Sequence, residues 1–182
     1  HHTLLQHIAD VIQQARNQVR AAVNSAMMQS YWEIGRLIVE HEQQGEKRAA
    51  YGKQQLQSIS ESLTAQFGKG FDVTNLRAMR QFYLLFPIRE TVSLELGWSH
   101  YRRLLRVENP QARAWYQREA ISQNWSVRAL DRQIGVLYYE RLLSSRDKTA
   151  VAAEAEQKIQ EQAESIHDYL RDPYILDFLN LP

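Results

Sequence analysis

The sequence predicts a predominantly all-α fold: a helix-turn-helix core flanked by long N- and C-terminal helices, with or without a small wing. Glycine and proline are scarce, at seven and four among 182 residues, and helix-favouring residue types are plentiful. The apolar fraction of 44% and the four tryptophans argue against a disordered chain. Apolar residues recur at steps of three and four along several segments, as in amphipathic helices. The length suits one domain with a substantial core.

A long amphipathic helix is expected from Leu4 to about His41. Its apolar positions form a heptad-like seam. The seam consists of Leu5, Ile8, Ile12, Ala15, Val19, Ala22 and Ala26. Its length and its alanines suit a partner helix, from a second copy or from the C-terminal helix described below, although packing within one domain also fits. Near Tyr31 and Trp32 the apolar face becomes larger, as where a helix enters a core. The polar stretch 43–48 is typical of a connection.

The helix-turn-helix core is expected at about residues 53–86. Gly68 or Gly70 can adopt the left-handed conformation that ends the first helix. Asp72 is a suitable N-cap for the second helix, because its carboxylate can accept hydrogen bonds from free N–H groups. The second helix then begins at Val73. In helix-turn-helix proteins the second helix reads DNA, so this segment carries the main functional hypothesis.

Shorter helices are expected after the core. Pro87 ends the second helix of the core, and residues 88–95 are a weak candidate for a short strand or wing. A short helix is predicted over 98–105 with Ser99 at its cap. Another helix begins at Asn109-Pro110, with proline in the first helical position.

The C-terminal part adds two more helices and an apolar segment. Ser126 caps a helix whose expected buried residues are Leu130, Ile134, Leu137 and Tyr138. A charged helix follows over about 149–171, and an apolar stretch over 174–179 follows Asp172-Pro173. We therefore divide the chain into a helical domain, 1–148, and an acidic helix and linker, 149–182, which we expect to lead into a further domain.

The charge distribution is uneven although the net charge is only +1. Residues 1–65 carry six basic and six acidic side chains, residues 66–148 carry fourteen and eight, and residues 149–182 carry two and seven. A basic middle beside an acidic tail fits a polyanion-binding module with a helical appendage. The alternative is that the arginines decorate solvated helix faces.

Three runs of residues resemble the N-terminal domain of the bacterial YhcG family. They are Gly70-Phe71-Asp72-Val73-Thr74-Asn75-Leu76-Arg77-Ala78-Met79-Arg80-Gln81-Phe82-Tyr83, Leu96-Gly97-Trp98-Ser99-His100-Tyr101-Arg102-Arg103-Leu104-Leu105 and Trp125-Ser126-Val127-Arg128-Ala129-Leu130-Asp131-Arg132-Gln133-Ile134. The resemblance covers nearly the whole chain. It implies a winged helix-turn-helix domain that precedes a C-terminal nuclease domain of the PD-(D/E)XK superfamily, and hence a DNA-binding, dimerising module of a metal-dependent nuclease.

Catalysis is not expected in this part of the protein. The chain has no cysteine, which excludes disulfides and thiolate chemistry. A nuclease of that superfamily needs an acidic residue and Glu-x-Lys on adjacent strands to hold Mg²⁺ and orient water. Glu156-Gln157-Lys158 has the spacing but lies in a helical segment, so a chance tripeptide is the better interpretation. We expect no cofactor here and Mg²⁺ only in the missing nuclease domain.

The candidate nucleic-acid-binding residues lie on the second helix of the core, in its turn and on the following helix. They are Lys69, Asn75, Arg77, Arg80, Gln81, Arg102 and Arg103. Arginine and glutamine suit major-groove readout, whereas Lys69, Arg102 and Arg103 suit phosphates. Asn75 lies nearer the core side, where supporting the cap is the alternative. Leu84 and Leu85 fall on the same outer side as Arg77. Either another element covers that end of the helix, or only its first two turns face the groove.

The expected partners are DNA and a second copy of the chain, since a symmetric dimer suits a paired DNA site. No membrane and no small-molecule substrate are expected, and the absence of an apolar secretory segment favours a cytoplasmic protein. The competing hypothesis is a protein–protein interaction and oligomerisation module that does not contact nucleic acid.

Overall fold

The computed structural model describes residues 2–44, 49–160 and 173–181, and every regular element in these ranges is helical. The α-helices are α1 (His2–Gln44), α2 (Ala49–Phe67), α3 (Val73–Leu85), α4 (Trp98–Leu104), α5 (Pro110–Ser122), α6 (Val127–Gly135), α7 (Tyr138–Ser144), α8 (Lys148–Gln160) and α10 (Pro173–Phe178), with one 3₁₀ turn, η1 (Arg89–Thr91). The predominantly all-α prediction is confirmed. None of the described helices is long and apolar enough to cross a membrane.

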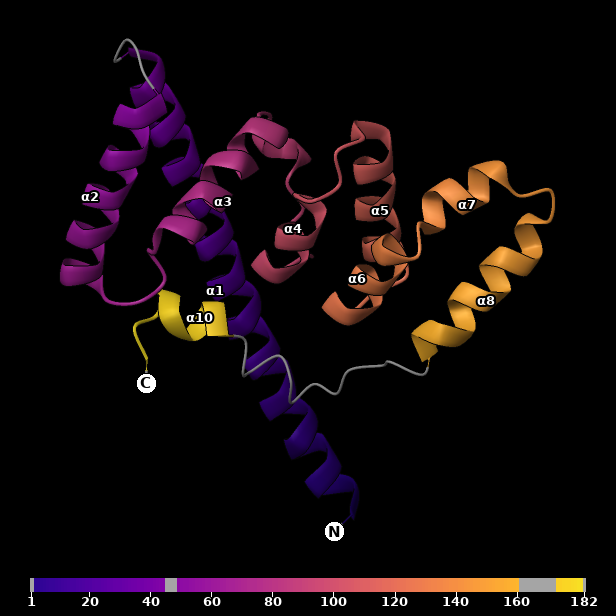
Figure 1. The fold of residues 1–182 in the computed structure, drawn as a ribbon. Helices are drawn as coiled ribbons and strands as arrows, with labels where there is room; N and C mark the ends of the chain where they lie inside the picture. Colours follow the sequence, from indigo (N-terminus) through magenta and orange to yellow (C-terminus); the bar gives the residue numbers. More distant parts are fainter. Residues whose placement is uncertain (1, 45–48, 161–172, 182) are drawn as a thin grey trace.

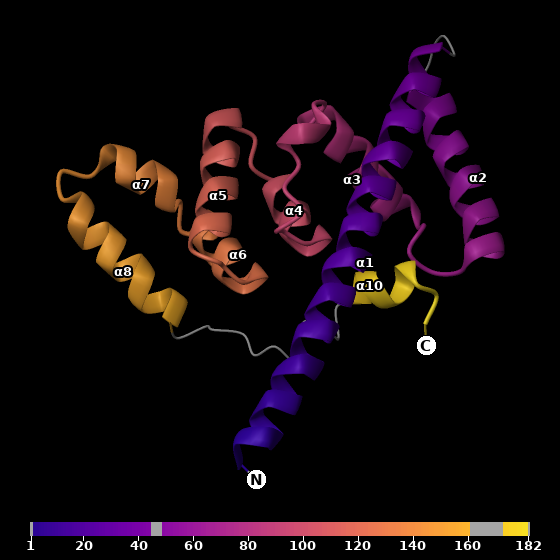
Figure 2. The same ribbon diagram turned by 180° about the vertical axis from the view of Figure 1, so that it is seen from behind.

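The long helix α1 runs diagonally through the molecule, and the other helices are arranged along it (Figure 1). Its C-terminal half packs chiefly against α3, while α2 runs back beside it. Its N-terminal half projects beyond the other described helices in both opposed views (Figures 1 and 2). The helices α5 to α8 extend away from α1 as a second group. The predicted first helix is confirmed, and only part of it enters the core.

Helices α1 and α3 approach closely at Gly35, which is buried on α1. A Cβ atom at Gly35 would overlap the backbone carbonyl oxygen of Met79 on α3. The indole Nε1 of Trp32, one turn earlier, donates a 2.7 Å hydrogen bond to the carbonyl oxygen of Phe86, the C-cap residue of α3. Glycine therefore allows the two backbones to approach, and tryptophan fixes the end of α3 on α1.

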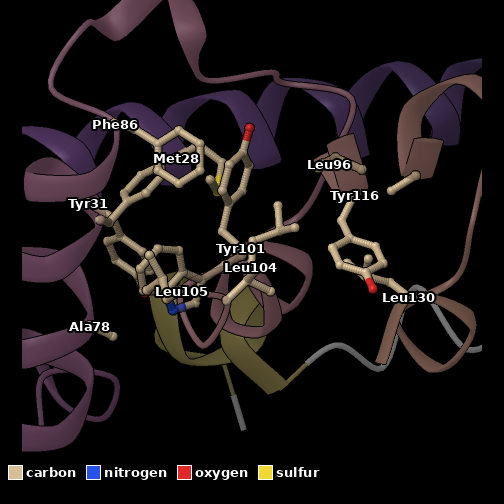
Figure 3. Packing of buried hydrophobic residues seen from close by; sticks show 14 of the residues in the cluster. Met28, Tyr31, Ala78, Phe86, Leu96, Tyr101, Leu104, Leu105, Tyr116 and Leu130 are labelled. Carbon is tan, nitrogen blue, oxygen red and sulfur yellow. The ribbon is translucent and has the colours of Figure 1, made fainter. Parts of the chain in front are cut away.

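The core is rich in aromatic rings. Met28, Tyr31, Phe86 and Tyr101 gather between α1, α3 and α4 (Figure 3). Rings of Tyr31 and Trp98 meet edge to face with centroids 5.0 Å apart. Such contacts add specific geometry to the burial of apolar surface.

Residues 88–95 do not form the expected strand or wing. They contain the turn η1 and an irregular loop, whose backbone groups bond to side chains instead of a strand ladder. The amide of Ser93 donates to the hydroxyl oxygen of Tyr101 at 2.6 Å, and the amide of Asn24 donates to the carbonyl oxygens of Leu94 and Leu96. Because side chains from α4 and α1 satisfy these groups, the segment needs no neighbouring strand.

Two other local predictions were wrong. The N-cap of α4 is Gly97, not Ser99, and the ring Nδ1 of His100 accepts from the Gly97 amide. The helix capped by Ser126 ends at Gly135 instead of continuing through Tyr138. Leu137 has a left-handed backbone, with φ of 54°, and is exposed. The chain therefore bends there, and Tyr138 reaches the core from α7.

The C-terminal segments only partly match the prediction. The predicted helix 149–171 is present up to Gln160, and the rest of it lies outside the described residues. The apolar stretch 174–179 forms most of α10, which packs on α1. The rings of Phe178 and Tyr31 lie 6.1 Å apart. The end of the chain is therefore anchored on the first helix.

Candidate nucleic-acid interface

The turn between α2 and α3 has the predicted glycine and cap geometry. Both Gly68 and Gly70 have positive φ, at 85° and 102°, a region that side-chain-bearing residues rarely adopt. Asp72 caps α3, with its carboxylate accepting a 2.8 Å hydrogen bond from the Asn75 amide. Ser60 of α2 donates to the carbonyl oxygen of Phe71 at 2.7 Å, which fixes the turn on the first helix. The start of α3 is thus held by local bonds.

Asn75 is part of the core and supports the start of α3. Its side chain is 4% exposed. The amide nitrogen donates to the carbonyl oxygen of Gly70 at 2.7 Å, and the amide oxygen accepts from the indole of Trp98 at 2.9 Å. These bonds leave Asn75 facing inwards, so a contact to DNA is not supported and the cap-supporting alternative is the one that the structure shows.

Arg77 and Gln81 lie on the outer side of α3. Arg77 is exposed and has no hydrogen bond or ion pair to another described residue. Gln81 is exposed as well, although its amide nitrogen donates to the carbonyl oxygen of Leu105 at 3.1 Å. An unneutralised guanidinium beside a side-chain amide supplies the donors and acceptor that base edges require.

The following helix α4 adds positive charge to the same side. The guanidinium of Arg102 lies 3.5 Å from the carbonyl oxygen of Thr74, in the first turn of α3. Together with the Gln81 bond to Leu105, this contact places α4 alongside the outer side of α3. Arg106 follows α4 and is exposed. We call Arg77, Gln81, Arg102 and Arg106 the α3–α4 face.

Two other predicted arginines are bound to carboxylates. The Nε of Arg80 donates to Glu42 of α1 at 2.7 Å. The Nε of Arg103 lies 3.1 Å from the carboxylate of Asp131 on α6, within ion-pairing distance although not aligned as a hydrogen bond. These pairs join α3 to α1 and α4 to α6. Both arginines are partly neutralised, and each points towards a neighbouring helix.

The remaining candidates lie at the ends of α3. Lys69 is exposed in the turn, next to α10, since a Cβ at Gly70 would lie 3.3 Å from that of Asp177. At the other end Leu84 is 44% exposed, and Leu85 is partly buried against the core. The polar part of the outer side is therefore limited to residues 73–81 of α3.

The buried polar groups near this face serve the fold. The ring Nε2 of His100 is 2.8 Å from the carbonyl oxygen of Trp125, so it carries the proton while Nδ1 accepts from Gly97. Arg113 is buried, donates to the carbonyl oxygen of Val107 at 2.7 Å, and has its pKa lowered by burial. The basic composition had not identified Arg113 as a core residue, since its partner is a backbone group.

Metal-binding side chains do not cluster in the described part of the chain: it holds no group of three His, Asp or Glu residues that could bind an ion. Glu156, Gln157 and Lys158 lie within α8, so the tripeptide sits on a helix as expected. The α3–α4 face thus offers a cationic surface among the residues described.

Comparisons with known proteins agree with the sequence resemblance. The family model described as DUF1016 N-terminal domain matches residues 7–141. The chain is 39% identical to the protein named "Putative nuclease YhcG" of Escherichia coli (strain K12), over an alignment of 209 residues that covers 96% of this chain and 54% of that protein. The chain thus spans about half the length of this relative. No solved structure matches. The resemblance to the YhcG family is confirmed, and the chain belongs to the DUF1016 N-terminal domain family.

Proposed function

We propose that the chain is the DNA-binding and dimerising N-terminal domain of a nuclease, whose catalytic PD-(D/E)XK domain lies outside this sequence. The observation that carries the proposal is the α3–α4 face. There, Arg77 is exposed without a partner among the described residues, and Arg102 contacts the first turn of α3. The name of the E. coli relative supports a role with nucleic acid.

The geometry favours α3 as the element that enters a groove. It starts directly after a short turn, and it presents Arg77 and Gln81 outwards. Arginine can bind guanine bidentately and glutamine can bind adenine. Arg102 and Arg106 on the neighbouring segment would meet phosphates, which position a protein without reading sequence. Arg80 and Arg103 contribute less, because carboxylates already neutralise them.

The test is a salt titration of duplex DNA binding, followed by fluorescence anisotropy. Affinity should fall steeply with salt, because each arginine or lysine side chain that neutralises a phosphate releases a counterion from the DNA. Arg77→Ala and Arg102→Ala should each weaken binding several-fold, and a phosphate contact should lower the salt slope by about 1. Arg36→Ala is the matched control, since Arg36 lies on α1 and pairs with Glu33 and Glu40. An equal loss in the control would exclude this face, and no binding at low salt would exclude the DNA proposal.

The catalytic assignment has a separate test. The fragment and the full-length protein are incubated with DNA and Mg²⁺ or Mn²⁺, and the products are separated on a gel. Cleavage by the full-length protein alone agrees with the proposal. Reproducible cleavage by the fragment would place catalysis within it.

A second candidate function is a protein–protein interaction module without nucleic-acid contact. A specific observation favours it, namely the exposed apolar side chains along the projecting half of α1, including Leu5, Val11 and Val19. DNA binding that is absent at low salt, together with self-association, would support this candidate.

A further inference from the structure

The projecting half of α1 carries an apolar stripe that the described residues leave exposed. Leu4, Leu5, Ile8, Val11, Ile12 and Val19 are each between 48% and 68% exposed. Scattered exposed apolar residues are ordinary, but a continuous set on one helix marks an interaction surface. We call residues 2–22 the arm.

The stripe and the core face lie on opposite sides of α1. Side chains rotate by 100° per residue along a helix, so Ile8, Val19 and Leu37 share one side, whereas Met28 and Gly35 share the other, roughly 170° away. Met28 and Gly35 are buried, and Leu37 is 55% exposed. The core that buries the C-terminal half of α1 therefore cannot cover the stripe. Leu37 lies on the same side of the helix as the stripe, beyond Ser30 and Glu33.

An apolar groove opens at the far end of the same helix. It lies between α1 and α2, has a volume of about 280 Å³ and is lined by Ile34, Leu37, Ile38, Leu56, Ile59 and Leu63. His41, Glu42, Gly52 and Gln55 also line it. The groove can take side chains from a helix that crosses its opening, and Leu37 lies both in the groove and on the side of α1 that carries the stripe.

We infer that two copies of the chain pair antiparallel along α1, with the arm of each copy lying over the α1–α2 groove of the other. This inference rests on the homodimer in the proposed function and assigns its contact surfaces. In a dimer with a two-fold axis, the arm of the first copy contacts the groove of the second, and the arm of the second contacts the groove of the first. Arm and groove lie on one helix, so one antiparallel pairing covers both arms and both grooves.

The spacing along α1 fits this arrangement. If Ile8 lies opposite Leu37 of the second copy, the axis passes between Ala22 and Val23, about 22 Å from each at 1.5 Å per residue. Val19 then lies opposite the second copy's Ala26. Ala22 and Ala26 are exposed, and small side chains at the centre allow the helices to approach closely.

The chain itself offers no equivalent partner in its described part. The C-terminal helix was the other candidate for the seam, but the described α8 packs on α6 and α7, away from the arm (Figures 1 and 2). An unrelated partner could cover the arm or the groove. A second copy is favoured because it covers both at once.

Cysteine cross-linking tests the pairing directly, because the chain has no cysteine of its own. A mixture of Ile8→Cys and Leu37→Cys proteins should give a disulfide-linked dimer on mild oxidation, and Ala22→Cys should cross-link with itself. Ile8→Cys alone should stay largely uncross-linked. The matched control is Gln6→Cys mixed with Leu37→Cys, since Gln6 is exposed on the opposite side of the arm and should react at least about tenfold less.

Sedimentation of the wild type, read together with the cross-linking, separates the antiparallel pairing from the homodimer of the proposed function. A dimer whose Ile8→Cys variant cross-links with itself, and not with Leu37→Cys, has parallel helices, which overturns the antiparallel pairing and leaves the dimer. A monomer at high concentration overturns both. Ile12→Glu should raise the dimer Kd about tenfold or more, since in this register residue 12 lies opposite Glu33 of the second copy and two carboxylates would face each other. Gln14→Glu, off the stripe, should leave the Kd unchanged. DNA binding is measured separately and decides neither outcome.

Discussion

The two halves of α1 are equally apolar and have different surroundings. In the C-terminal half, Met27 and Tyr31 are fully buried against the rest of the domain. In the arm, Ile8 and Val19 are 48% and 65% exposed. Both halves repeat apolar residues every three or four positions, so the pattern alone does not distinguish them. The difference lies in what covers each half. The C-terminal half packs on α3, with Gly35 permitting the close approach, whereas we propose that a second copy of the chain covers the arm.

The largest expected effect compares one truncation in each half. Met27→Ala should lower the free energy of unfolding by about 2–5 kcal/mol, because it removes fully buried atoms and leaves a cavity. Val19→Ala, at an exposed site, should change it by less than about 0.5 kcal/mol at concentrations where the chain is monomeric. Denaturant titration of both variants measures the difference. Equal losses at low concentration would mean that the arm is buried within its own chain.

A smaller loss is expected where α1 and α3 touch. Gly35→Ala should lower the free energy of unfolding by about 1–3 kcal/mol, since the new Cβ meets the backbone of Met79. Alanine normally favours a helix over glycine by up to about 1 kcal/mol, so steric overlap must exceed that gain. Gly135→Ala is the control, because nothing lies within 4 Å of its Cβ position. If Gly35→Ala left the free energy of unfolding unchanged, α1 and α3 would be able to move apart at no cost in stability.

The local signals near the turn were sufficient to predict its structure. Gly68, Gly70 and Asp72 act through neighbours a few residues away, so their spacing predicted the end of α2 and the cap of α3. Leu137 was misplaced because the helical spacing continues through it. Gly135 ends α6, but the residue with the left-handed backbone is the leucine two positions later. A positive φ is uncommon for leucine, so the residue type gave no signal of this conformation.

It was harder to predict which residues of the candidate site face solvent, because several of them are arginines. Arg77, Arg80 and Arg103 have the same chemistry, and the differences arise from carboxylates far along the chain. Glu42 precedes Arg80 by 38 residues, and Asp131 follows Arg103 by 28 residues. No local pattern reports such pairs. Periodicity did place Arg77 outwards on α3, which is the part of the DNA hypothesis that the sequence supports best.

Alkaline pH should weaken the domain core without acting on the arm, which has no tyrosine. Burial raises the pKa of Tyr101 from 10.0 to about 12, and burial also raises that of Tyr116. Because the folded pKa exceeds the unfolded value, the stabilisation is complete below pH 10 and is lost as the pH rises towards 12. For Tyr101 the loss is about 2–3 kcal/mol at 1.36 kcal/mol per pKa unit.

The measurement is denaturant unfolding at a series of pH values between 8 and 12. Tyr101→Phe, which cannot ionise, should have a shallower loss above pH 10 than the wild type, despite a lower starting stability from its lost bonds to Ser93 and Gln117. The same slope in both proteins would mean that Tyr101 ionises without unfolding the core.

The smallest expected effect links the core to the proposed interface. Trp98→Phe removes the indole that donates to Asn75 and should lower the free energy of unfolding by about 1–2 kcal/mol, since the buried amide oxygen loses its partner. Trp115→Phe is the matched control on α5, where the ring contacts other aromatic rings.

Asn75 holds the first turn of α3, and Arg77 lies two residues further along the helix. If Arg77 reads DNA from a fixed position, Trp98→Phe should also weaken DNA binding although no charge changes, while Trp115→Phe should not. Unchanged binding in Trp98→Phe would mean that charge alone, and not the fixed start of α3, governs the contact.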